Sequence, residues 1–259
     1  MRVKSLAAQA FMRYNGAERR NIMRAKYIYH SGFMVEGESH RLLFDYYKGE
    51  LPAPDAARHL SVFASHHHED HYDPEIFVYG EKTPDTMYYL GCDIMLNAAN
   101  RQKMGISDDI FARCRRMHKD DVLTYHDVRV QALRSTDMGV AFFIECEGKN
   151  IYFAGDHSLW IWHEDATFDR SQIHRFYEEI EKLRGKPIDA AFLPLDPRLG
   201  EEYWRGFDAF VRLLEPRRIF PMHMVDDYDI IRRMKENPIA WPYKNRIMNV
   251  CEDGGWMDI

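Results

Sequence analysis

Hydrophobic and polar residues alternate in short blocks along this chain, and the blocks predict many β-strands. Short runs of apolar and β-branched residues bounded by turn-forming residues are typical of strands. The predicted strands cover Lys26 to Glu36, Arg41 to Phe44, Leu60 to Ala64, Thr86 to Leu90, Val122 to Tyr125, Val128 to Leu133, Gly139 to Glu145, Asn150 to Ala154, Ala190 to Leu193 and Arg218 to Pro221. The first two are expected to pair through Gly37-Glu38-Ser39, and the four between Val122 and Ala154 are expected to be antiparallel because short turns separate them.

Longer segments with helical spacing lie between and after these strands. The predicted helices cover Asp93 to Met104, Ser171 to Leu183, Glu201 to Leu214 and Asp226 to Met234. Asp73-Pro74-Glu75 marks another helix start, because proline suits the first turn and an acid suits the positive end of the helix dipole. Strands of mixed order with helices outside predict a layered sandwich in which helices cover β-sheets.

Residues 1–25 form an N-terminal extension rich in Arg and Lys, with Glu18 as its single acid. We expect a short amphipathic helix built on Leu6, Ala7, Ala10 and Phe11; a transit peptide is the alternative, since a secretory apolar core is missing. Residues 26–259 contain no repeat, low-complexity tract or Gly/Pro/Ser-rich linker, so they are expected to form a single domain.

Composition narrows the classes of partner. The formal net charge of −6 argues against a nucleic-acid or membrane-surface binder, because either needs a basic face. No apolar run approaches the ~20 residues that span a bilayer. The four cysteines are scattered without a C-x-x-C pair, which fits a reducing cytoplasm. We therefore expect a cytoplasmic protein that acts on a small molecule; a homo-oligomer is compatible with the sequence, which does not decide the oligomeric state.

The most informative segment is H-x-H-x-D-H, made by His66, His68, Asp70 and His71 directly after a predicted strand. In extended chain alternate side chains point the same way, so His66 and His68 can bind one ion. Asp70 and His71 lie beyond the strand, where a turn can direct them to a second ion. Imidazole and carboxylate ligands suit zinc, iron or manganese. The competing interpretation is a surface histidine run without a role.

Two later strands end in residues of the same kind. Asp156 follows the strand Asn150 to Ala154, and its two carboxylate oxygens can bridge two ions. His223 follows the strand Arg218 to Pro221. Taken alone, Asp156 is an ordinary turn residue and His223 an ordinary structural histidine; the H-x-H-x-D-H segment makes both candidate ligands.

This ordered set of motifs resembles the metallo-β-lactamase superfamily from about Tyr27 to about Met234. His30-Ser31-Gly32 and Tyr152-Phe153-Ala154-Gly155-Asp156 are similar to the compact lactonase and phosphodiesterase-like hydrolases rather than the secreted antibiotic-degrading enzymes. The resemblance implies a four-layer αβ/βα sandwich of two mixed β-sheets flanked by helices. It also implies two divalent metal ions between the sheet edges, zinc first, with manganese or iron as alternatives.

Carried over by position, His66 and His68 bind the first metal, Asp70, His71 and His223 bind the second, and Asp156 bridges them. The family usually supplies one more histidine for the first metal, and here Asp137 occupies the expected place. A carboxylate there gives a harder, more anionic site that shifts preference towards manganese or iron. Alternatively Asp137 is a turn residue, and His126 or His157 completes the first site.

The chemistry expected of such a pair is hydrolysis. A hydroxide bridging two metal ions forms near neutral pH and attacks an ester, lactone or phosphodiester, while the cations stabilise the developing oxyanion. Asp70 is expected to orient this nucleophile as well as bind metal. The sequence contains no Ser-His-Asp arrangement, Walker loop or G-x-G-x-x-G to offer competing chemistry.

Five residues outside the carried-over ligand set are candidates for substrate contact or proton transfer. Trp160 and Trp162 form a substrate wall or pack their loop onto the core; His157, or His163 in its place, donates a proton. Arg198 receives an anionic substrate or forms a surface salt bridge.

Further roles remain open. His30 either orients a ligand or is a core histidine, and His67 and Glu69 are expected to point away. The alternatives to a hydrolase are a di-iron redox protein acting on oxygen or nitric oxide and a non-catalytic metal-binding scaffold.

Overall fold

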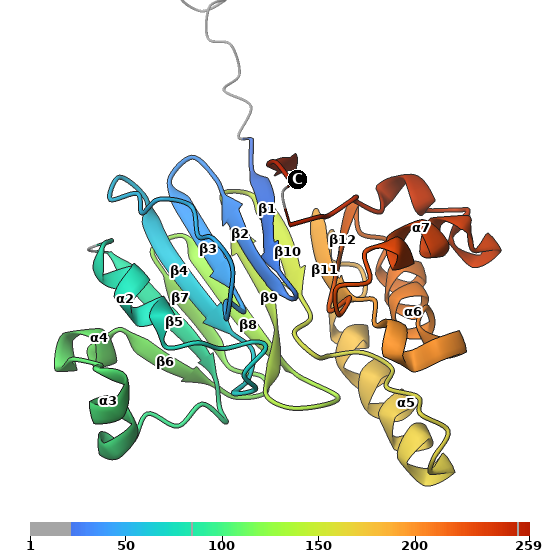
Figure 1. The fold of residues 1–259 in the computed structure, drawn as a ribbon, viewed down its shortest axis with the longest axis horizontal. Coiled ribbons are helices and arrows are strands. Elements are labelled where there is room, and N and C mark those ends of the chain that lie inside the picture. The colour runs from blue at the N-terminus through green and yellow to red at the C-terminus, as the bar shows by residue number, and fades with distance from the viewer. Residues whose placement is uncertain (1–21, 84, 253) are drawn as a thin grey trace, which may run out of the picture.

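The computed structural model describes residues 22–83, 85–252 and 254–259, which form two mixed β-sheets (Figure 1). The first sheet has the strand order β13-β1-β2-β3-β4-β5-β6. Its strands are β1 (Arg24–Tyr29), β2 (Gly32–Glu36), β3 (His40–Phe44), β4 (His59–Ala64), β5 (Thr86–Gly91), β6 (Cys114–Met117) and β13 (Met257–Asp258). β3 to β6 run parallel, whereas β13, β1, β2 and β3 are antiparallel neighbours.

The second sheet has the order β12-β11-β10-β9-β8-β7. Its strands are β7 (Val122–Tyr125), β8 (Val128–Arg134), β9 (Val140–Cys146), β10 (Lys149–Phe153), β11 (Ala190–Pro194) and β12 (Arg218–Met222). β7 to β10 form an antiparallel meander, as the short turns between them predicted. β10, β11 and β12 are parallel, because helices connect them.

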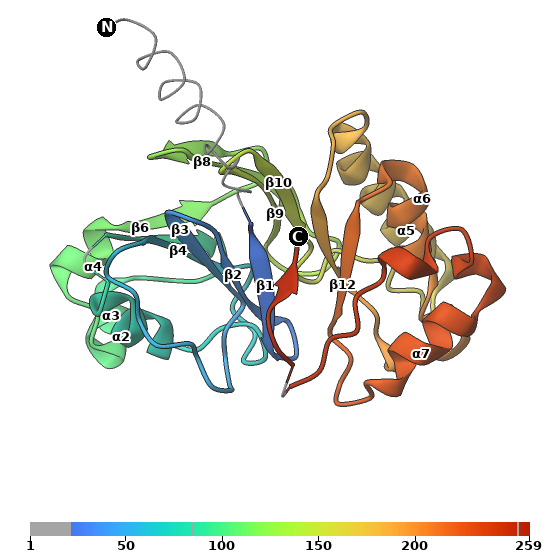
Figure 2. The ribbon, with the colours of Figure 1, turned by 90° about the horizontal axis from the view of Figure 1, so that it is seen from above.

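Helices cover the outer face of each sheet (Figure 2). α2 (Glu75–Glu81), α3 (Ala98–Met104) and α4 (Asp108–Ala112) lie on the first sheet; α5 (Ala166–Ile180), α6 (Arg205–Leu214) and α7 (Asp229–Glu236) lie on the second. Short 3-10 segments are η1 (Glu181–Leu183), η2 (Pro197–Glu202), η3 (Pro238–Ala240) and η4 (Lys244–Arg246). The four-layer αβ/βα sandwich of two mixed β-sheets is confirmed.

Aromatic side chains fill the space between the two sheets. Phe44 of β3 stacks on Phe153 of β10 with ring centroids 4.6 Å apart, and Phe33 of β2 meets Phe192 of β11 at 4.7 Å. All four rings are fully buried. Interlocking rings from both sheets fix how the sheets face each other, and so fix where the strand ends meet.

The strand predicted over Lys26 to Glu36 is in fact two strands. His30 has a φ of 53°, a left-handed conformation that turns the chain between β1 and β2. The run is apolar on both sides of the turn, so hydrophobic pattern alone did not reveal it. The pattern also missed α4, β6 and β13, which are short. It began the helices at 93 and 201 several residues too early, where the structure has loop and 3-10 turn.

The helix predicted on Leu6, Ala7, Ala10 and Phe11 lies outside the described residues, and the last two residues of the predicted extension, Arg24 and Ala25, belong to β1. Among the described residues, no helix combines the length and the apolar character needed to cross a membrane.

Candidate metal centre

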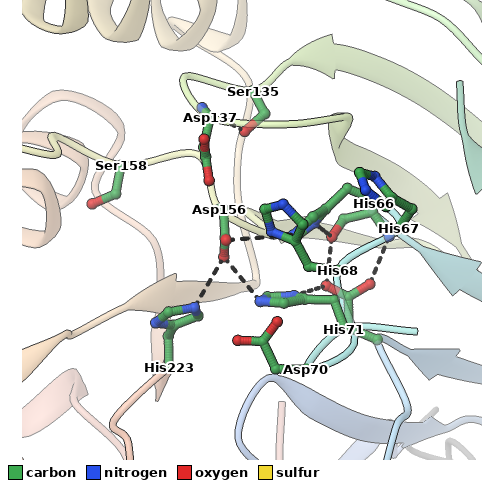
Figure 3. A network of polar contacts seen from close by, with 12 residues as sticks. His66, His67, His68, Asp70, His71, Ser135, Asp137, Asp156, Ser158 and His223 are labelled. Carbon is green, nitrogen blue, oxygen red and sulfur yellow. Dashed lines mark hydrogen bonds and ion pairs between the residues drawn. The ribbon is translucent and has the colours of Figure 1, made fainter. Parts of the chain in front are cut away.

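Histidine and aspartate side chains from four separate strand ends meet where the two sheets come together (Figure 3). His30 follows β1, the segment His66 to His71 follows β4, Asp156 follows β10 and His223 follows β12. The aromatic core between the sheets fixes how they pack, and this packing brings the loops at the four strand ends together. The first and last of these residues are 193 positions apart in sequence (223 − 30).

Asp156 lies at the middle of the group. Its Oδ1 is 3.1 Å from His71 Nε2 and 3.3 Å from His223 Nε2, and its Oδ2 is 3.5 Å from His66 Nε2. The Asp156 side chain is only 7% exposed. Burial opposes its ionisation, but the neighbouring His71 and His223 hold its pKa well below the usual value. Asp156 is therefore the anion around which the three imidazoles converge.

The donor atoms fall into two groups, each compact enough to surround an ion. In one, the ligand atoms of His66, His68 and Asp70 all lie within 4.8 Å of one another, with His66 Nε2 and His68 Nδ1 2.9 Å apart. In the other, His30, Asp70, His71 and His223 meet the same limit. Asp70 belongs to both groups. The predicted ligands His66, His68, Asp70, His71, Asp156 and His223 are thus brought together, with His30 added.

The buried polar atoms at the centre fit a cation. Among the described residues, Nε2 of His30, His71 and His223 and Oδ1 of Asp156 are buried and make ion-pair contacts at 3.1–3.4 Å, but none of them makes a hydrogen bond of normal geometry. Leaving one such atom unsatisfied costs about 1–3 kcal/mol, and native proteins rarely do so without reason. Three imidazole nitrogens and a carboxylate oxygen aimed at one another form a donor set that suits a divalent transition ion.

A buried aspartate that follows β3 orients two of these histidines. Asp45 accepts hydrogen bonds from the Ser65 amide at 2.7 Å and the Ser65 hydroxyl at 2.6 Å, and it pairs with His71 Nδ1 at 2.7 Å. Ser65 Oγ in turn lies 2.9 Å from His66 Nδ1. These contacts hold the Nδ1 atoms, so that the Nε2 atoms of His66 and His71 are directed at Asp156. Metal-binding histidines are usually oriented by such a partner on the second ring nitrogen.

A second aspartate orients His223 in the same manner. Asp196 Oδ2 lies 3.0 Å from His223 Nδ1, and the Arg198 guanidinium forks onto the Asp196 carboxylate at 2.5–3.0 Å. Burial opposes the charge on Asp196, but His223 and Arg198 lower its pKa to about 2. Arg198 thus does form the salt bridge considered for it, while remaining 52% exposed beside the site.

Two glycines allow the segments around Ser65 to approach closely. Gly155 has a φ of 50°, and a Cβ there would lie 2.5 Å from Ser65 Cβ. Gly139 has a φ of 63°, and a Cβ there would lie 2.0 Å from the Ser65 carbonyl oxygen. Only glycine fits both the left-handed backbone and the contact. The Gly-Asp motif therefore has a physical basis: Gly155 permits the approach that places Asp156.

Asp137 lies beside the group and faces Asp156. Figure 3 shows its carboxylate directed towards the Asp156 carboxylate. Burial and the negative charge of Asp156 raise the pKa of Asp137. The two like charges repel each other, and a cation bound nearby would relieve that repulsion. His126, the alternative for this place, lies in the β7–β8 turn against Asp85 and does not reach the group. Asp137 as a ligand remains a prediction that this placement supports.

His157 corrects the sequence-based assignment of a proton donor. Its ring is buried against Phe176 of α5, with centroids 5.0 Å apart and planes 17° from parallel. Burial lowers the pKa of His157 to about 4, so the ring is neutral at pH 7. The chain turns immediately after Asp156, so successive side chains enter opposite environments: Asp156 enters the site and His157 enters the core beneath α5. His157 therefore does not complete the first metal group either.

We expect His157→Leu to change kcat/KM by less than about threefold, since a true general acid contributes 10²–10⁴-fold. Steady-state kinetics on protein whose folding is checked by circular dichroism measures this. A loss of 10²-fold or more with the fold intact would restore His157 to the catalytic group.

The tryptophans of the same loop lie next to the site. Trp160 is buried; its Nε1 donates to the Asp156 carbonyl at 2.8 Å, and its ring centroid is 5.6 Å from that of His223. Trp162 lies parallel to Trp160 at 6.5 Å and is 42% exposed. Trp160 thus packs the loop against the site, while Trp162 presents its ring to solvent. The alternative donor His163 is exposed and pairs with Glu202 at 3.0 Å.

His67 and Glu69 point away, as expected. The His67 ring pairs with Asp93 at 2.6 Å, and Glu69 is exposed. The residues that sequence reasoning missed or undervalued are His30, Asp45 and Asp196. Each directly follows a strand or comes two residues after one, and a systematic search of strand ends for His and Asp would have found them.

Comparison with known proteins is consistent with this geometry. A model of the beta-lactamase superfamily domain matches residues 24–170. The chain is similar to the structure of Igni18, a metallo hydrolase from the archaeon Ignicoccus hospitalis, at 16% identity and a TM-score of 0.61 over 92% of this chain and 98% of that one. It is also similar to YhfI, a metallo-beta-lactamase fold protein from Bacillus subtilis, at 14% identity and a TM-score of 0.58 over 92% and 100% of the chains.

A third similar structure is that of a hydroxylase rather than a hydrolase. CmlA, a diiron β-hydroxylase from Streptomyces venezuelae, is 14% identical with a TM-score of 0.52, over 90% of this chain but only 48% of the CmlA chain. At such identities the likeness shows the fold alone. The curated proteins searched include no match to the sequence.

Proposed function

The chain belongs to the beta-lactamase superfamily, and we propose that it is a metal-dependent hydrolase that cleaves an ester, lactone or phosphodiester bond in a small, anionic substrate. One observation carries the proposal: the ligand atoms of His30, Asp70, His71 and His223 lie within 4.8 Å of one another beside the buried Asp156 carboxylate. The imidazole Nε2 atoms of His30, His71 and His223 make no hydrogen bond of normal geometry among the described residues, and a divalent cation would satisfy them.

We assign the ligands as two sets that share the Asp156 carboxylate. His66 and His68, with Asp137, would hold one ion; His71 and His223, with Asp70, would hold the other; Asp156 would contact both. His30 lies close enough to Asp70, at 3.4 Å, to orient that carboxylate or to join the second set. Zinc is the first candidate, and the carboxylate of Asp137 keeps manganese and iron as alternatives.

Divalent ions held there would polarise the scissile carbonyl or phosphoryl group and bring the pKa of a water molecule towards neutrality. Asp70 is the residue we assign to orient that water by accepting a hydrogen bond from it. Its side chain is 43% exposed while the histidines around it are buried, so it is the carboxylate of the group that faces incoming substrate. The contact with the His30 imidazole at 3.4 Å lowers the pKa of Asp70, so the carboxylate is ionised and can accept a hydrogen bond.

Arg198 and Trp162 are assigned to the substrate. Arg198 is partly exposed, and its guanidinium lies 3.5 Å from His223 Nδ1, so its charge is available to an anionic group at the site mouth. Trp162 offers an exposed ring that lies parallel to that of Trp160.

We expect Trp162→Ala to raise KM about tenfold with kcat changed by less than about twofold. Burying part of an indole against substrate contributes on the order of 1.4 kcal/mol, and it does so equally in the ground and transition states. Trp241→Ala is the matched control, because Trp241 is 62% exposed and follows η3, away from the site. An unchanged KM for Trp162→Ala would remove this residue from the substrate wall.

The experiment that tests the function is metal restoration. Chelated full-length protein receives zinc, manganese or iron separately, and each sample is assayed against bis(p-nitrophenyl) phosphate, a lactone and a simple ester. We expect cleavage of at least one substrate class to return with the metal. A metal-loaded protein inert against the whole panel would overturn the hydrolase and favour the metal-binding scaffold.

A di-iron oxidation activity is the second candidate, and Asp137 is the observation that favours it. A carboxylate in place of the usual histidine makes the first site harder and more suited to iron. Oxygen consumption by iron-loaded protein, absent from the zinc-loaded sample, would identify this activity and replace the hydrolase proposal.

A further inference from the structure

A second cluster of imidazoles and carboxylates lies at the opposite end of the same sandwich. His59 is the first residue of β4, and Asp85 directly precedes β5, both in the first sheet. His126 lies in the turn between β7 and β8, in the second sheet. β4 runs from His59 towards His66, so at ~3.3 Å per residue the cluster lies about 20 Å from the candidate metal centre.

The three side chains are arranged around a single carboxylate oxygen. His126 Nε2 is 3.0 Å from Asp85 Oδ2, and His59 Nδ1 contacts the same oxygen. The two imidazole rings are stacked, with centroids 4.2 Å apart and planes 28° from parallel. All three ligand atoms lie within 4.8 Å of one another. Two imidazole nitrogens therefore meet at one carboxylate oxygen, close enough for all three atoms to bind one ion.

Neighbouring residues hold this arrangement in place. The Tyr125 hydroxyl donates to Asp85 Oδ1 at 2.8 Å, which leaves Oδ2 for the two histidines. His59 Nδ1 is buried and, although it touches Asp85, makes no hydrogen bond of normal geometry to any described residue. This nitrogen is paired with the Asp85 carboxylate as an ion-pair contact. An outer hydrogen bond such as that from Tyr125 is the usual means of orienting a ligating carboxylate.

Buried His40 supports the cluster from inside. Its ring centroid is 5.1 Å from that of His59, and its nitrogens pair with Asp127 at 2.9 Å and Glu147 at 3.1 Å. Asp127 follows His126 in the β7–β8 turn, and Glu147 lies in the β9–β10 turn. The hairpins of the second sheet are therefore already tied to the strand starts of the first sheet by histidine–carboxylate contacts.

We propose that His59, Asp85 and His126 form a separate zinc-binding site that clamps the β7–β8 hairpin to the β4–β5 edge of the first sheet. Two imidazoles and a carboxylate form one of the ligand sets that bind zinc with an open fourth position. That position faces solvent, since the three side chains are 38%, 36% and 42% exposed, and water can fill it. An ion held there would join residues of the two sheets that are 67 positions apart in sequence (126 − 59).

The test is the number of zinc ions bound per chain. Full-length protein stripped by chelator is titrated with zinc alone, and bound metal is counted for the wild type, His126→Asn and His174→Asn. Asparagine suits position 126 because His126 has a φ of 48°, which asparagine tolerates. His174 is an exposed histidine on α5 and serves as the matched control. We expect His126→Asn to bind one ion fewer than the wild type, and His174→Asn to bind the wild-type number.

Thermal unfolding and a second variant give independent readouts. We expect added zinc to raise the melting temperature less in Asp85→Asn than in the wild type, because the variant loses the anionic ligand but retains an acceptor for Tyr125. Tyr125→Phe should bind zinc at this site about 10–100-fold more weakly, as expected when a ligand's orienting partner is removed. If His126→Asn misfolds, Asp85→Asn decides by the same count. Equal stoichiometry in the wild type and a folded variant of either residue would overturn the site.

Discussion

Asp156→Ala is expected to lower kcat/KM by on the order of 10³-fold or more. Asp156 is the anion on which His66, His71 and His223 converge, and it is the residue we assign to both ions. Metal-ion catalysis contributes several kcal/mol of transition-state stabilisation, and each 1.36 kcal/mol is a factor of ten in rate. Steady-state kinetics at saturating metal, with bound metal measured on the same sample, checks this expectation.

The matched control is Asp208→Ala, which removes another buried carboxylate. Asp208 lies in α6, where it accepts from Arg212 at 2.8 Å and from Tyr243 at 2.7 Å, away from the candidate centre. Asp208→Ala should lower stability while leaving the rate per folded molecule within about threefold. If Asp156→Ala retained its metal and more than a tenth of the activity, Asp156 would not be a bridging ligand.

The fold could be predicted largely because its strands are short, apolar and separated by clear turns. The meander β7 to β10 shows this best, since His126-Asp127 and Glu147-Gly148 interrupt four β-rich runs. The turn at His30 could not be predicted in this way. It depends on a left-handed residue in an apolar segment, and tertiary contacts, including the hydrogen bond from the His223 amide to the His30 carbonyl at 3.1 Å, hold it there.

The candidate ligands could be predicted because local sequence carries them. His66, His68, Asp70 and His71 are adjacent in sequence, and Asp156 and His223 end recognisable strands. Their orientation could not be predicted from the same pattern. Ser65 and Asp45 are separated by 20 residues, and Asp196 and His223 by 27, so only packing of the sheets brings these pairs together.

His157 shows that a position next to a candidate ligand in the sequence does not establish a catalytic role. It follows Asp156 directly and so looked like a second reactive group, but its ring packs on Phe176 of α5. Trp160, three residues further, returns to the site through its contact with His223. Packing against α5 therefore decides which side chains of this loop face the candidate metal centre.

The buried contacts of Asp45 make a second large effect predictable. Asp45→Ala is expected to lower the free energy of unfolding by about 3–5 kcal/mol, the usual cost of removing one partner from a buried charged pair. The Ser65 amide, the Ser65 hydroxyl and His71 Nδ1 would all lose their acceptor in a site from which water is excluded. Denaturant unfolding of metal-free protein measures this loss.

The same substitution should also weaken zinc binding at the centre about 10–100-fold, because His66 and His71 would no longer be held with Nε2 towards Asp156. The control is Asp109→Ala in the exposed first turn of α4, for which we expect a change in stability within about 0.5 kcal/mol and unaltered zinc affinity. Wild-type stability and affinity in Asp45→Ala would mean that the histidines are oriented by the metal itself. A loss of affinity alone would mean that Asp45 acts on ligand geometry and contributes little to the fold. The combined loss that we expect follows from one carboxylate being both a buried acceptor of the core and the residue that directs two imidazoles into the site.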